Sequence, residues 1–216
     1  MIAFSGIDCG GKSTQIDLIS QYMKDHKIRH RILWSRGGYT PCLEAMKTLI
    51  RSDKSSDEHG RQAEQYRAQV HANPKKRKLL LWLSILDLGL YYGIWFRLVE
   101  LFGFTILADR YFWDSYIDFK LKYPEFDFEQ WCVWRFAKAI YKKPEHSIIY
   151  TIPAEVSMYR STLKDEPWPE TREERAARID CYMEQVGLGR WQHVIDATAS
   201  IEEVERATKK VLCYED

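Results

Sequence analysis

The stretch from Gly6 to Thr14, which reads Gly-Ile-Asp-Cys-Gly-Gly-Lys-Ser-Thr, has the residue types and spacing of a phosphate-binding loop. Its glycines permit a tight turn whose backbone N–H groups point at an oligophosphate, and the following helix points the positive end of its dipole at the same anion. In this pattern Lys12 reaches the β and γ phosphates, and the Ser13 hydroxyl binds Mg²⁺. The motif therefore predicts that the chain binds a nucleoside triphosphate with Mg²⁺, and a chance match in a strand–turn–helix unit is the minor alternative. The other residues expected around the phosphates are Gly6, Cys9, Gly10, Gly11 and Thr14.

Three charged residues that follow predicted strands are the next candidates for chemistry. Asp109 and Arg110 follow the apolar run Phe104–Ala108, and Arg36 follows the run Arg29–Ser35. Because ligands bind beyond the carboxyl ends of parallel strands, we expect all three at the rim that carries the phosphate loop. There Asp109 would hold Mg²⁺, and the two arginines would face the phosphates. For each of the three, a surface salt bridge is the alternative.

The residue after Asp109 also indicates the type of reaction. ATPases of the motor and transport type usually place a glutamate there to activate water, whereas this chain has Arg110. The chain also lacks the Asn-Lys-x-Asp sequence with which a GTPase reads guanine. We therefore expect phosphoryl transfer to a bound acceptor rather than hydrolysis.

Strand-like and helix-like segments alternate along the chain and must position these residues. This alternation predicts a five-stranded parallel sheet with helices on both faces, a three-layer α/β/α arrangement of P-loop NTPase type. We expect one domain over residues 1–216, with a polar insertion at 52–75. The predicted strands are Met1–Ser5, Arg29–Ser35, Phe104–Ala108, His146–Ile152 and His193–Ile195. The predicted helices are Lys12–Asp25, Pro41–Arg51, Leu79–Phe96, Trp113–Lys122, Phe128–Lys142, Pro153–Leu163, Thr171–Val186 and a last one that begins after Ser200.

The composition is that of an ordinary enzyme. The 216 residues carry 32 Lys and Arg against 31 Asp and Glu, so net charge does not favour an anionic membrane, and nucleic acid is only a secondary alternative as partner.

Five scattered cysteines without a C-x-x-C pair argue against a disulfide framework or a zinc site and favour a cytoplasmic location. Because the first predicted strand begins at Met1, we expect no signal or transit peptide. The apolar run Leu79–Phe96 carries Asp87 at its centre, so we expect a helix in the core or at a subunit interface rather than a membrane span.

Several short motifs, taken in order along the chain, resemble those of thymidylate kinases. They are Gly6-Ile-Asp8-x-x-Gly11-Lys-Ser-Thr14, Arg36-Gly-Gly with Thr40-Pro41, Asp109-Arg110-Tyr111, Pro153-Ala-Glu-Val156, and Val194-Ile-Asp196-Ala with Ser200-Ile-Glu-Glu-Val204. Those after the phosphate loop are weak signals one by one, but their shared order covers nearly the whole length. The resemblance implies a kinase that transfers the γ-phosphoryl group of ATP to a nucleoside monophosphate. It also implies a homodimer whose two-fold interface buries the helix near Leu79–Phe102.

The resemblance implies roles for residues of the acceptor site. Asp8 would face the sugar end of the acceptor, while Arg36 and Arg110 would hold its phosphate. Tyr111, in the same motif as Arg110, is counted with this site, and the aromatic residue type of Trp82 makes it a further candidate to stack on the acceptor.

The resemblance likewise implies an adenine site and a lid. Ala197 and Thr198 would lie beside the adenine of ATP, and residues 160–175 would form a lid over it. The phosphate loop has Cys9-Gly10 where one branch of the family carries an arginine, so an arginine of the lid would assist catalysis. Arg160 is the first choice and Arg172 the second. For Arg172 and its neighbour Arg175, the alternative is a solvated helix face shared with Glu170 and Glu174.

The sequence departs from the family where the base of the acceptor should be read. Thymidylate kinases usually carry an arginine in the helix before the third strand, and this chain has Leu88 there. A base edge buried without a partner costs about 1–3 kcal/mol, so we expect thymidine monophosphate to be a poor substrate. Two alternatives stay open. One is a kinase of the same fold whose acceptor is a modified nucleotide, a nucleic-acid base, a sugar or a lipid-linked intermediate, and the other is a nucleotide-binding regulatory protein without turnover.

Overall fold

Five short runs rich in branched and aromatic residues form one all-parallel sheet, with the strands in the order β2-β3-β1-β4-β5. The computed structural model describes residues 1–35, 73–164 and 170–214. The predicted helix at Pro41–Arg51, the residue Arg36 and the insertion as far as residue 72 lie outside these ranges. The prediction of a five-stranded parallel sheet is confirmed. Its strands are β1 (Ile2–Gly6), β2 (His30–Trp34), β3 (Thr105–Asp109), β4 (His146–Thr151) and β5 (His193–Asp196).

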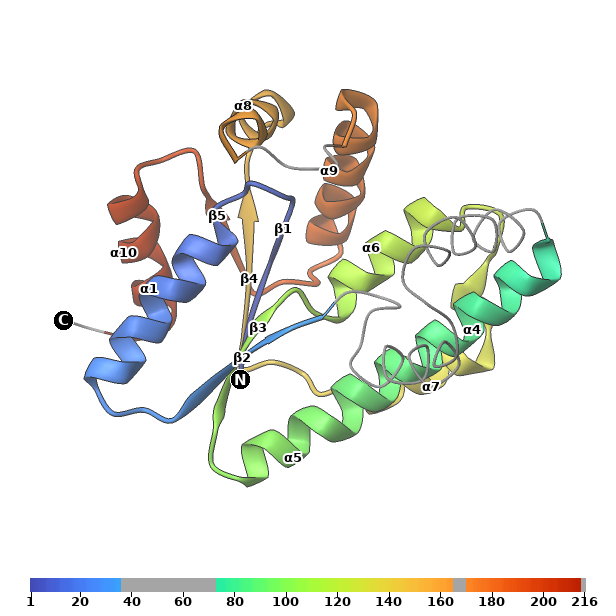
Figure 1. Cartoon of the computed structure of the whole chain (residues 1–216), viewed down its shortest axis with the longest axis horizontal. Coiled ribbons are helices and arrows are strands. Elements are labelled where there is room, and N and C mark those ends of the chain that lie inside the picture. Colours follow the sequence, from blue (N-terminus) through green and yellow to red (C-terminus); the bar gives the residue numbers. More distant parts are fainter. Residues whose placement is uncertain (36–72, 165–169, 215–216) are drawn as a thin grey trace, which may run out of the picture.

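Helices cover both faces of the sheet, as the buried faces of parallel strands require (Figure 1). On one face, α1 (Lys12–Asp25) and α10 (Ile201–Val211) contact each other. The other helices that flank the sheet are α4 (Pro74–Leu90), α5 (Phe96–Leu101), α6 (Phe112–Lys122), α7 (Cys132–Ile140) and α9 (Arg172–Gly187), on the opposite face. The helix α8 (Ala154–Lys164) stands above the carboxyl ends of the strands. The described residues therefore form an α/β/α arrangement.

The long apolar helix begins earlier and ends later than its sequence indicates. The side chain of Asn73 accepts hydrogen bonds from the backbone N–H groups of Lys75 and Lys76, so the helix starts at Pro74, inside the predicted polar insertion. A π-helical turn at Tyr91–Trp95 joins α4 to α5 without a break. The segment Pro74–Leu101 is long and apolar enough to cross a membrane, but half of its most apolar window is buried inside the protein, as in a core helix.

One predicted helix is wrong as a single element. The segment Phe128–Lys142 divides into a 3₁₀ turn at Phe128–Gln130 and the helix α7. The division falls at Trp131, whose backbone is extended and whose N–H closes the turn by donating to the carbonyl of Phe128. Apolar periodicity continues across this point, which is why the sequence gives no sign of the break.

The core on the face of α4 to α7 is unusually aromatic. The rings of Tyr92 and Tyr111 lie 4.3 Å apart, and those of Phe112 and Tyr141 lie 4.2 Å apart. The helices α4 and α7 approach so closely that a Cβ added to Gly89 would lie 2.9 Å from the Cβ of Ala137. Both Cβ atoms are attached directly to helix backbone, so no change of side-chain rotamer can lengthen this distance.

We therefore expect Gly89→Ala to lower the free energy of unfolding, because its methyl group overpacks the contact between α4 and α7 by about 1–3 kcal/mol and outweighs a gain in helix propensity of up to about 1 kcal/mol. The matched control is Gly187→Ala on α9, where an added Cβ meets nothing within 4 Å, so that variant should be no less stable than the wild type. Urea unfolding of both variants measures the contrast. Equal stability of the two variants would contradict the close approach.

Candidate functional site

The loop between β1 and α1 has the backbone geometry of an anion cradle. Gly6 and Gly11 have positive φ values of 134° and 85°, and Cys9 lies between them at 61°. A Cβ on Gly6 would lie 2.5 Å from the carbonyl oxygen of Tyr150, so the loop can pass over β4 only with glycine there. Within the described residues no side chain caps α1, which leaves its first N–H groups facing the concave side of the loop.

Lys12 folds back into this loop. Its Nζ donates hydrogen bonds to the carbonyls of Gly6 at 2.9 Å and of Ile7 at 2.6 Å, and its side chain is buried. Burial, together with the positive charge of Arg110, lowers the pKa of Lys12 to about 8. The nearby carboxylates act in the opposite direction without restoring the ordinary value. Lys12 is therefore a desolvated cation held at the point where the loop would receive an anion.

Asp109 lies at the carboxyl end of β3, on the same rim. Burial raises the pKa of its carboxyl group, and the nearby cations Lys12 and Arg110 oppose this shift. Its Oδ1 is buried and accepts no hydrogen bond from any described residue. The hydroxyl-bearing Ser13 is exposed at the start of α1. A buried carboxylate oxygen without a partner, beside a phosphate loop, fits a Mg²⁺ ion that also binds phosphate oxygens.

Arg110 is held in a strained conformation. Its φ of 68° lies in the left-handed region, which disfavours a residue with a side chain. Its guanidinium is buried, forms an ion pair with Asp8, and donates a hydrogen bond to the Tyr182 hydroxyl at 3.4 Å. The predicted acceptor residues Asp8 and Arg110 are therefore brought together, and Arg110 is not on the surface.

Asp114 and Tyr182 complete the site and were missed from the sequence. The carboxylate of Asp114 accepts hydrogen bonds from the Ser5 hydroxyl at 2.5 Å, the Tyr111 backbone N–H at 2.9 Å and the Tyr182 hydroxyl at 2.6 Å. It also accepts a longer bond from the N–H of Gly6, the first residue of the loop, at 3.4 Å. One sequence signal was available for Asp114, because an acidic residue at the third position of α6 is a typical helix cap.

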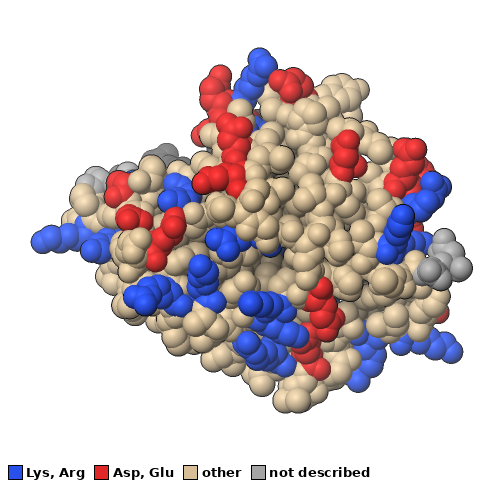
Figure 2. Space-filling view, turned by 180° about the vertical axis from the view of Figure 1, so that it is seen from behind, with Lys and Arg blue, Asp and Glu red and all other residues tan. Residues whose placement is uncertain are grey.

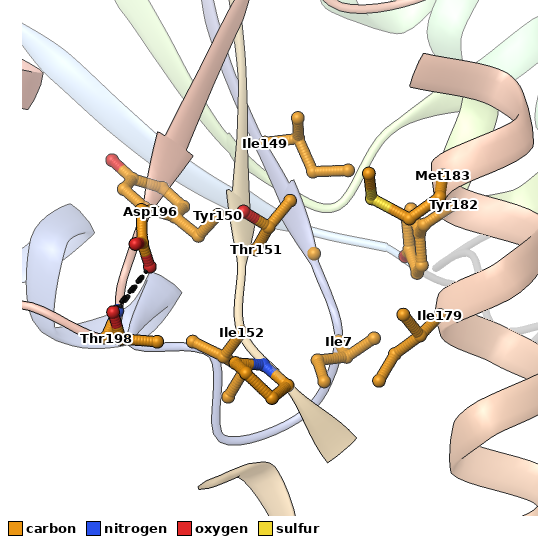
Figure 3. Close-up of a pocket in the computed structure, with 12 residues that line it drawn as sticks. Ile7, Ile149, Tyr150, Thr151, Ile152, Ile179, Tyr182, Met183, Asp196 and Thr198 are labelled. Atoms are coloured by element: carbon orange, nitrogen blue, oxygen red, sulfur yellow. Dashed lines mark hydrogen bonds between the residues drawn. The ribbon is translucent and has the colours of Figure 1, made fainter. Parts of the chain in front are cut away.

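The lid region contributes two arginines in very different settings. Arg160 of α8 donates a hydrogen bond to the carbonyl of Ala197 at 2.9 Å, so these two predicted residues meet. Arg172 pairs with Glu155, and both side chains are about two-thirds exposed. Beside Ala197, the backbone N–H and hydroxyl of Thr198 both donate to Asp196 (Figure 3). Residues 165–169 of the lid are outside the described ranges.

The interpretation of Arg175 as part of a solvated helix face is wrong. Arg175 is buried, and its guanidinium donates hydrogen bonds to the hydroxyls of Ser157 at 2.5 Å and Ser161 at 3.4 Å. The Ser157 hydroxyl in turn donates to the carbonyl of Asp8, in the phosphate loop. The physical reason is that Arg175 belongs to the inward stripe of α9, which consists of Arg175, Arg178, Tyr182 and Gln185.

Two predicted acceptor residues have other surroundings. Tyr111 is buried, its ring packs on Tyr92, and its hydroxyl donates to the carbonyl of Lys142. Trp82 is partly exposed in the first half of α4, and no described contact joins it to the phosphate loop. Leu88, which stands where the family has an arginine, is completely buried.

Comparison with known proteins adds no further residue to this site. The sequence matches no protein-family model. A search of curated proteins also finds no match. The chemistry of the site is therefore inferred from the side chains around Gly6–Thr14 and their partners.

We expect Asp114→Ala to lower the free energy of unfolding by about 3 kcal/mol or more, because it leaves three buried donors without their acceptor. The matched control is Asp180→Ala on the exposed side of α9, which should change stability by no more than about 0.5 kcal/mol. Urea denaturation gives both values. A loss for Asp114→Ala no larger than the control would show that this carboxylate does not hold the loop.

Proposed function

We propose that the protein is an ATP- and Mg²⁺-dependent phosphotransferase of the thymidylate kinase-like type, which transfers the γ-phosphoryl group of ATP to a nucleoside monophosphate. The observation that carries the proposal is the convergence of Lys12, Asp109 and Arg110 on the loop that begins at Gly6. A cation, a carboxylate with a free oxygen and a second cation are the groups that phosphoryl transfer uses.

Each residue has a role in this proposal. The loop N–H groups and the start of α1 would bind the β and γ phosphates, and Lys12 would exchange the carbonyls of Gly6 and Ile7 for phosphate oxygens. Asp109 and Ser13 would hold Mg²⁺, which neutralises charge on the phosphates when it is bound. An acceptor oxygen then forms a bond to the γ phosphorus as the bond from phosphorus to the β–γ bridging oxygen breaks, and ADP leaves.

The setting of Arg110 supports transfer rather than hydrolysis. The residue after Asp109 is a buried arginine paired with Asp8, so no carboxylate stands at this position to activate water. Arg110 would hold the phosphate of the acceptor in the role that the resemblance gives it, and Asp8 would release the guanidinium to that phosphate. Arg160, beside Ala197, is the described lid cation best placed to approach ATP bound at Ala197 and Thr198.

The identity of the acceptor is the open part of the proposal. The burial of Leu88 supports the expectation that thymidine monophosphate is a poor substrate, because an apolar core residue offers no hydrogen bond to a base. The same chemistry would serve a modified nucleotide, a sugar or a lipid-linked acceptor. A regulatory protein without turnover would bind ATP and Mg²⁺ through the same groups, so transfer of the γ-phosphoryl group distinguishes a kinase from it.

The proposal is tested by incubating the protein with Mg²⁺ and γ-labelled ATP against nucleoside monophosphates, sugars and short oligonucleotides. We expect transfer of label to a nucleoside monophosphate other than thymidine monophosphate, and none with Lys12→Ala, which excludes a contaminating kinase. No labelled product from any acceptor would refute the proposed activity.

Replacing Asp109 with Asn should reduce turnover on the order of a hundredfold and raise the Mg²⁺ concentration needed for half-maximal rate, because an amide binds Mg²⁺ less strongly than a carboxylate. Asp17→Asn, on the exposed side of α1, is the matched control and should leave both values unchanged. A Mg²⁺ titration of the rate distinguishes the variants. An unaltered Mg²⁺ requirement in Asp109→Asn would remove this residue from the metal site.

ATP affinity should depend on pH through Lys12. Beside the loop carbonyls the pKa of Lys12 is about 8, and a bound triphosphate would favour its charged form, so binding would raise that pKa. Below pH 8 the amine is already protonated and affinity stays constant. Above pH 8 binding requires uptake of a proton, so affinity should fall by up to about tenfold per pH unit.

The control for this pH dependence is Lys12→Arg, whose guanidinium stays charged throughout the range. Calorimetric titrations of ATP between about pH 7 and about pH 10 should show a slope in the wild type and none in Lys12→Arg. The same slope in both proteins would assign the effect to another group.

We also propose that the protein acts as a homodimer in the cytoplasm. The long helix exposes a row of apolar side chains, which a second copy would cover. The four described cysteines are free thiols, which supports a reducing location. The row consists of Leu79, Leu83, Leu90, Ile94, Leu98 and Leu101.

Light scattering across micromolar concentrations should give the mass of a dimer, and Ile94→Asp should give that of a monomer, because it places a charge in the middle of the row. The control is Asp87→Asn, which changes the charge of the same helix but places no charge within the row, so it should leave the dimer intact. A wild-type protein that stays monomeric would contradict the dimer but not the proposed activity.

A further inference from the structure

A cavity of about 490 Å³ lies between β4 and α9, beneath the first residues of the phosphate loop (Figure 3). Its walls come from Ile149 and Thr151 of β4 and from Ile179, Tyr182 and Met183 of α9. Ile7 closes the side toward the loop. The cavity opens to solvent where Met183 and Asp196 are exposed, and its size is that of pockets that receive small molecules.

This cavity is distinct from the cradle that would hold the phosphates. Gly6 and Ile7 line it, but Gly10, Gly11, Lys12 and Ser13 do not. Lys12 points its amine at the carbonyls of the loop instead. An occupant of the cavity would therefore touch the loop from the side of α9, while the phosphates approach the start of α1.

The charges around the cavity select the chemistry of an occupant. Among the described lining residues the one carboxylate is Asp196, and no cation lines the cavity. The N–H and hydroxyl of Thr198 lower the pKa of Asp196, so it is ionised at neutral pH. Tyr182 stays neutral, because burial and the adjacent Asp114 raise its pKa. Thr198, which would lie beside the adenine of ATP, also lines the cavity, so an occupant would share this edge with a bound nucleotide. An apolar body with a positive charge finds both aliphatic walls and a carboxylate here, whereas a negative charge meets no cation among the described lining residues.

We propose that this cavity is a binding site for a compact apolar amine, whose ring or branched chain packs among Ile7, Ile149 and Ile179 and whose ammonium group meets Asp196. Burial of the apolar part supplies affinity, because it removes apolar surface from water. The carboxylate supplies the preference for a cation. The site binds a class of molecule different from the phosphorylated ligands of the loop.

An amine bound here would also act on the phosphate loop. It would contact Gly6 and Ile7 directly. It would also contact Tyr182, whose hydroxyl joins Arg110 to Asp114. Binding of the amine should therefore change the affinity for the nucleotide, and binding of the nucleotide should change the affinity for the amine by the same factor. This influence rests on the proposed function, whereas the amine site rests on the cavity alone.

Three probes with one indole ring test the site: tryptamine is cationic, indole is neutral and indole-3-acetate is anionic. Calorimetric titration of the full chain should give tryptamine at least tenfold tighter binding than indole-3-acetate, with indole between them. In Asp196→Asn, which keeps an oxygen for Thr198, the difference between the two charged probes should vanish. Absence of tryptamine binding, or equal affinity for the two charged probes, would overturn the proposal.

Two variants locate the site within the cavity. Ile179→Trp fills the cavity and should abolish tryptamine binding, and Met183→Trp does the same from the exposed end if the first variant does not fold. Leu188→Trp, at the exposed end of α9 and outside the cavity, is the matched control and should bind tryptamine normally. Tryptamine binding that survives both cavity-filling variants would also overturn the proposal.

The influence on the loop is measured by titrating ATP with and without saturating tryptamine, and we expect at least a threefold change in affinity. An ATP affinity that tryptamine does not change would refute the coupling. If ATP does not bind at all, the proposed function fails, and the tryptamine titrations still decide the amine site.

Discussion

The carboxylate of Asp114 joins three elements that the sequence places far apart. It accepts hydrogen bonds from the end of β1 at Ser5 and Gly6, from the backbone at the start of α6, and from Tyr182 on α9. A buried carboxylate is tolerated only when such donors surround it, so each donor is fixed in turn. The phosphate loop therefore begins at a strand end whose position is fixed by contacts with both α6 and α9. Without this anchor, the convergence of Lys12, Asp109 and Arg110 would have no fixed geometry.

The charged groups at the rim satisfy one another within the protein. Lys12 bonds to loop carbonyls, Arg110 pairs with Asp8, and Asp109 lies near both cations. In the proposed function, a triphosphate would substitute for contacts that already exist, so the cations would need no large movement to meet it. Low local dielectric strengthens each of these interactions and would equally strengthen their attraction to phosphate. On the face that Figure 2 shows, basic and acidic side chains are both present, with a group of basic ones in the lower part of the view, so this face does not carry one sign of charge alone.

Much of this arrangement could be predicted from the sequence, because its signals are local. The glycine spacing from Gly6 to Lys12 indicates the loop, and an apolar run before Asp109 indicates a strand tip on the same rim. The burial of Arg175 and the role of Tyr182 could not be predicted, because both depend on which face of α9 turns inward, and that is decided by packing against α6 and α8. The start of α4 was misplaced because the cap at Asn73 lies within a polar stretch that offers no periodicity. Trp82 is a candidate for the acceptor site by its residue type alone, and within the described residues no contact joins this partly exposed side chain to the rim.

The central claim is that the loop from Gly6 to Thr14 binds a nucleoside triphosphate together with Mg²⁺. Its most direct test is a calorimetric titration of ATP into the wild-type protein, once with Mg²⁺ and once with the metal chelated. The account predicts saturable binding of one ATP per chain that weakens at least tenfold when Mg²⁺ is removed, because Asp109 then faces the phosphates without the ion between them. Absence of saturable binding, or the same affinity with and without Mg²⁺, would contradict it.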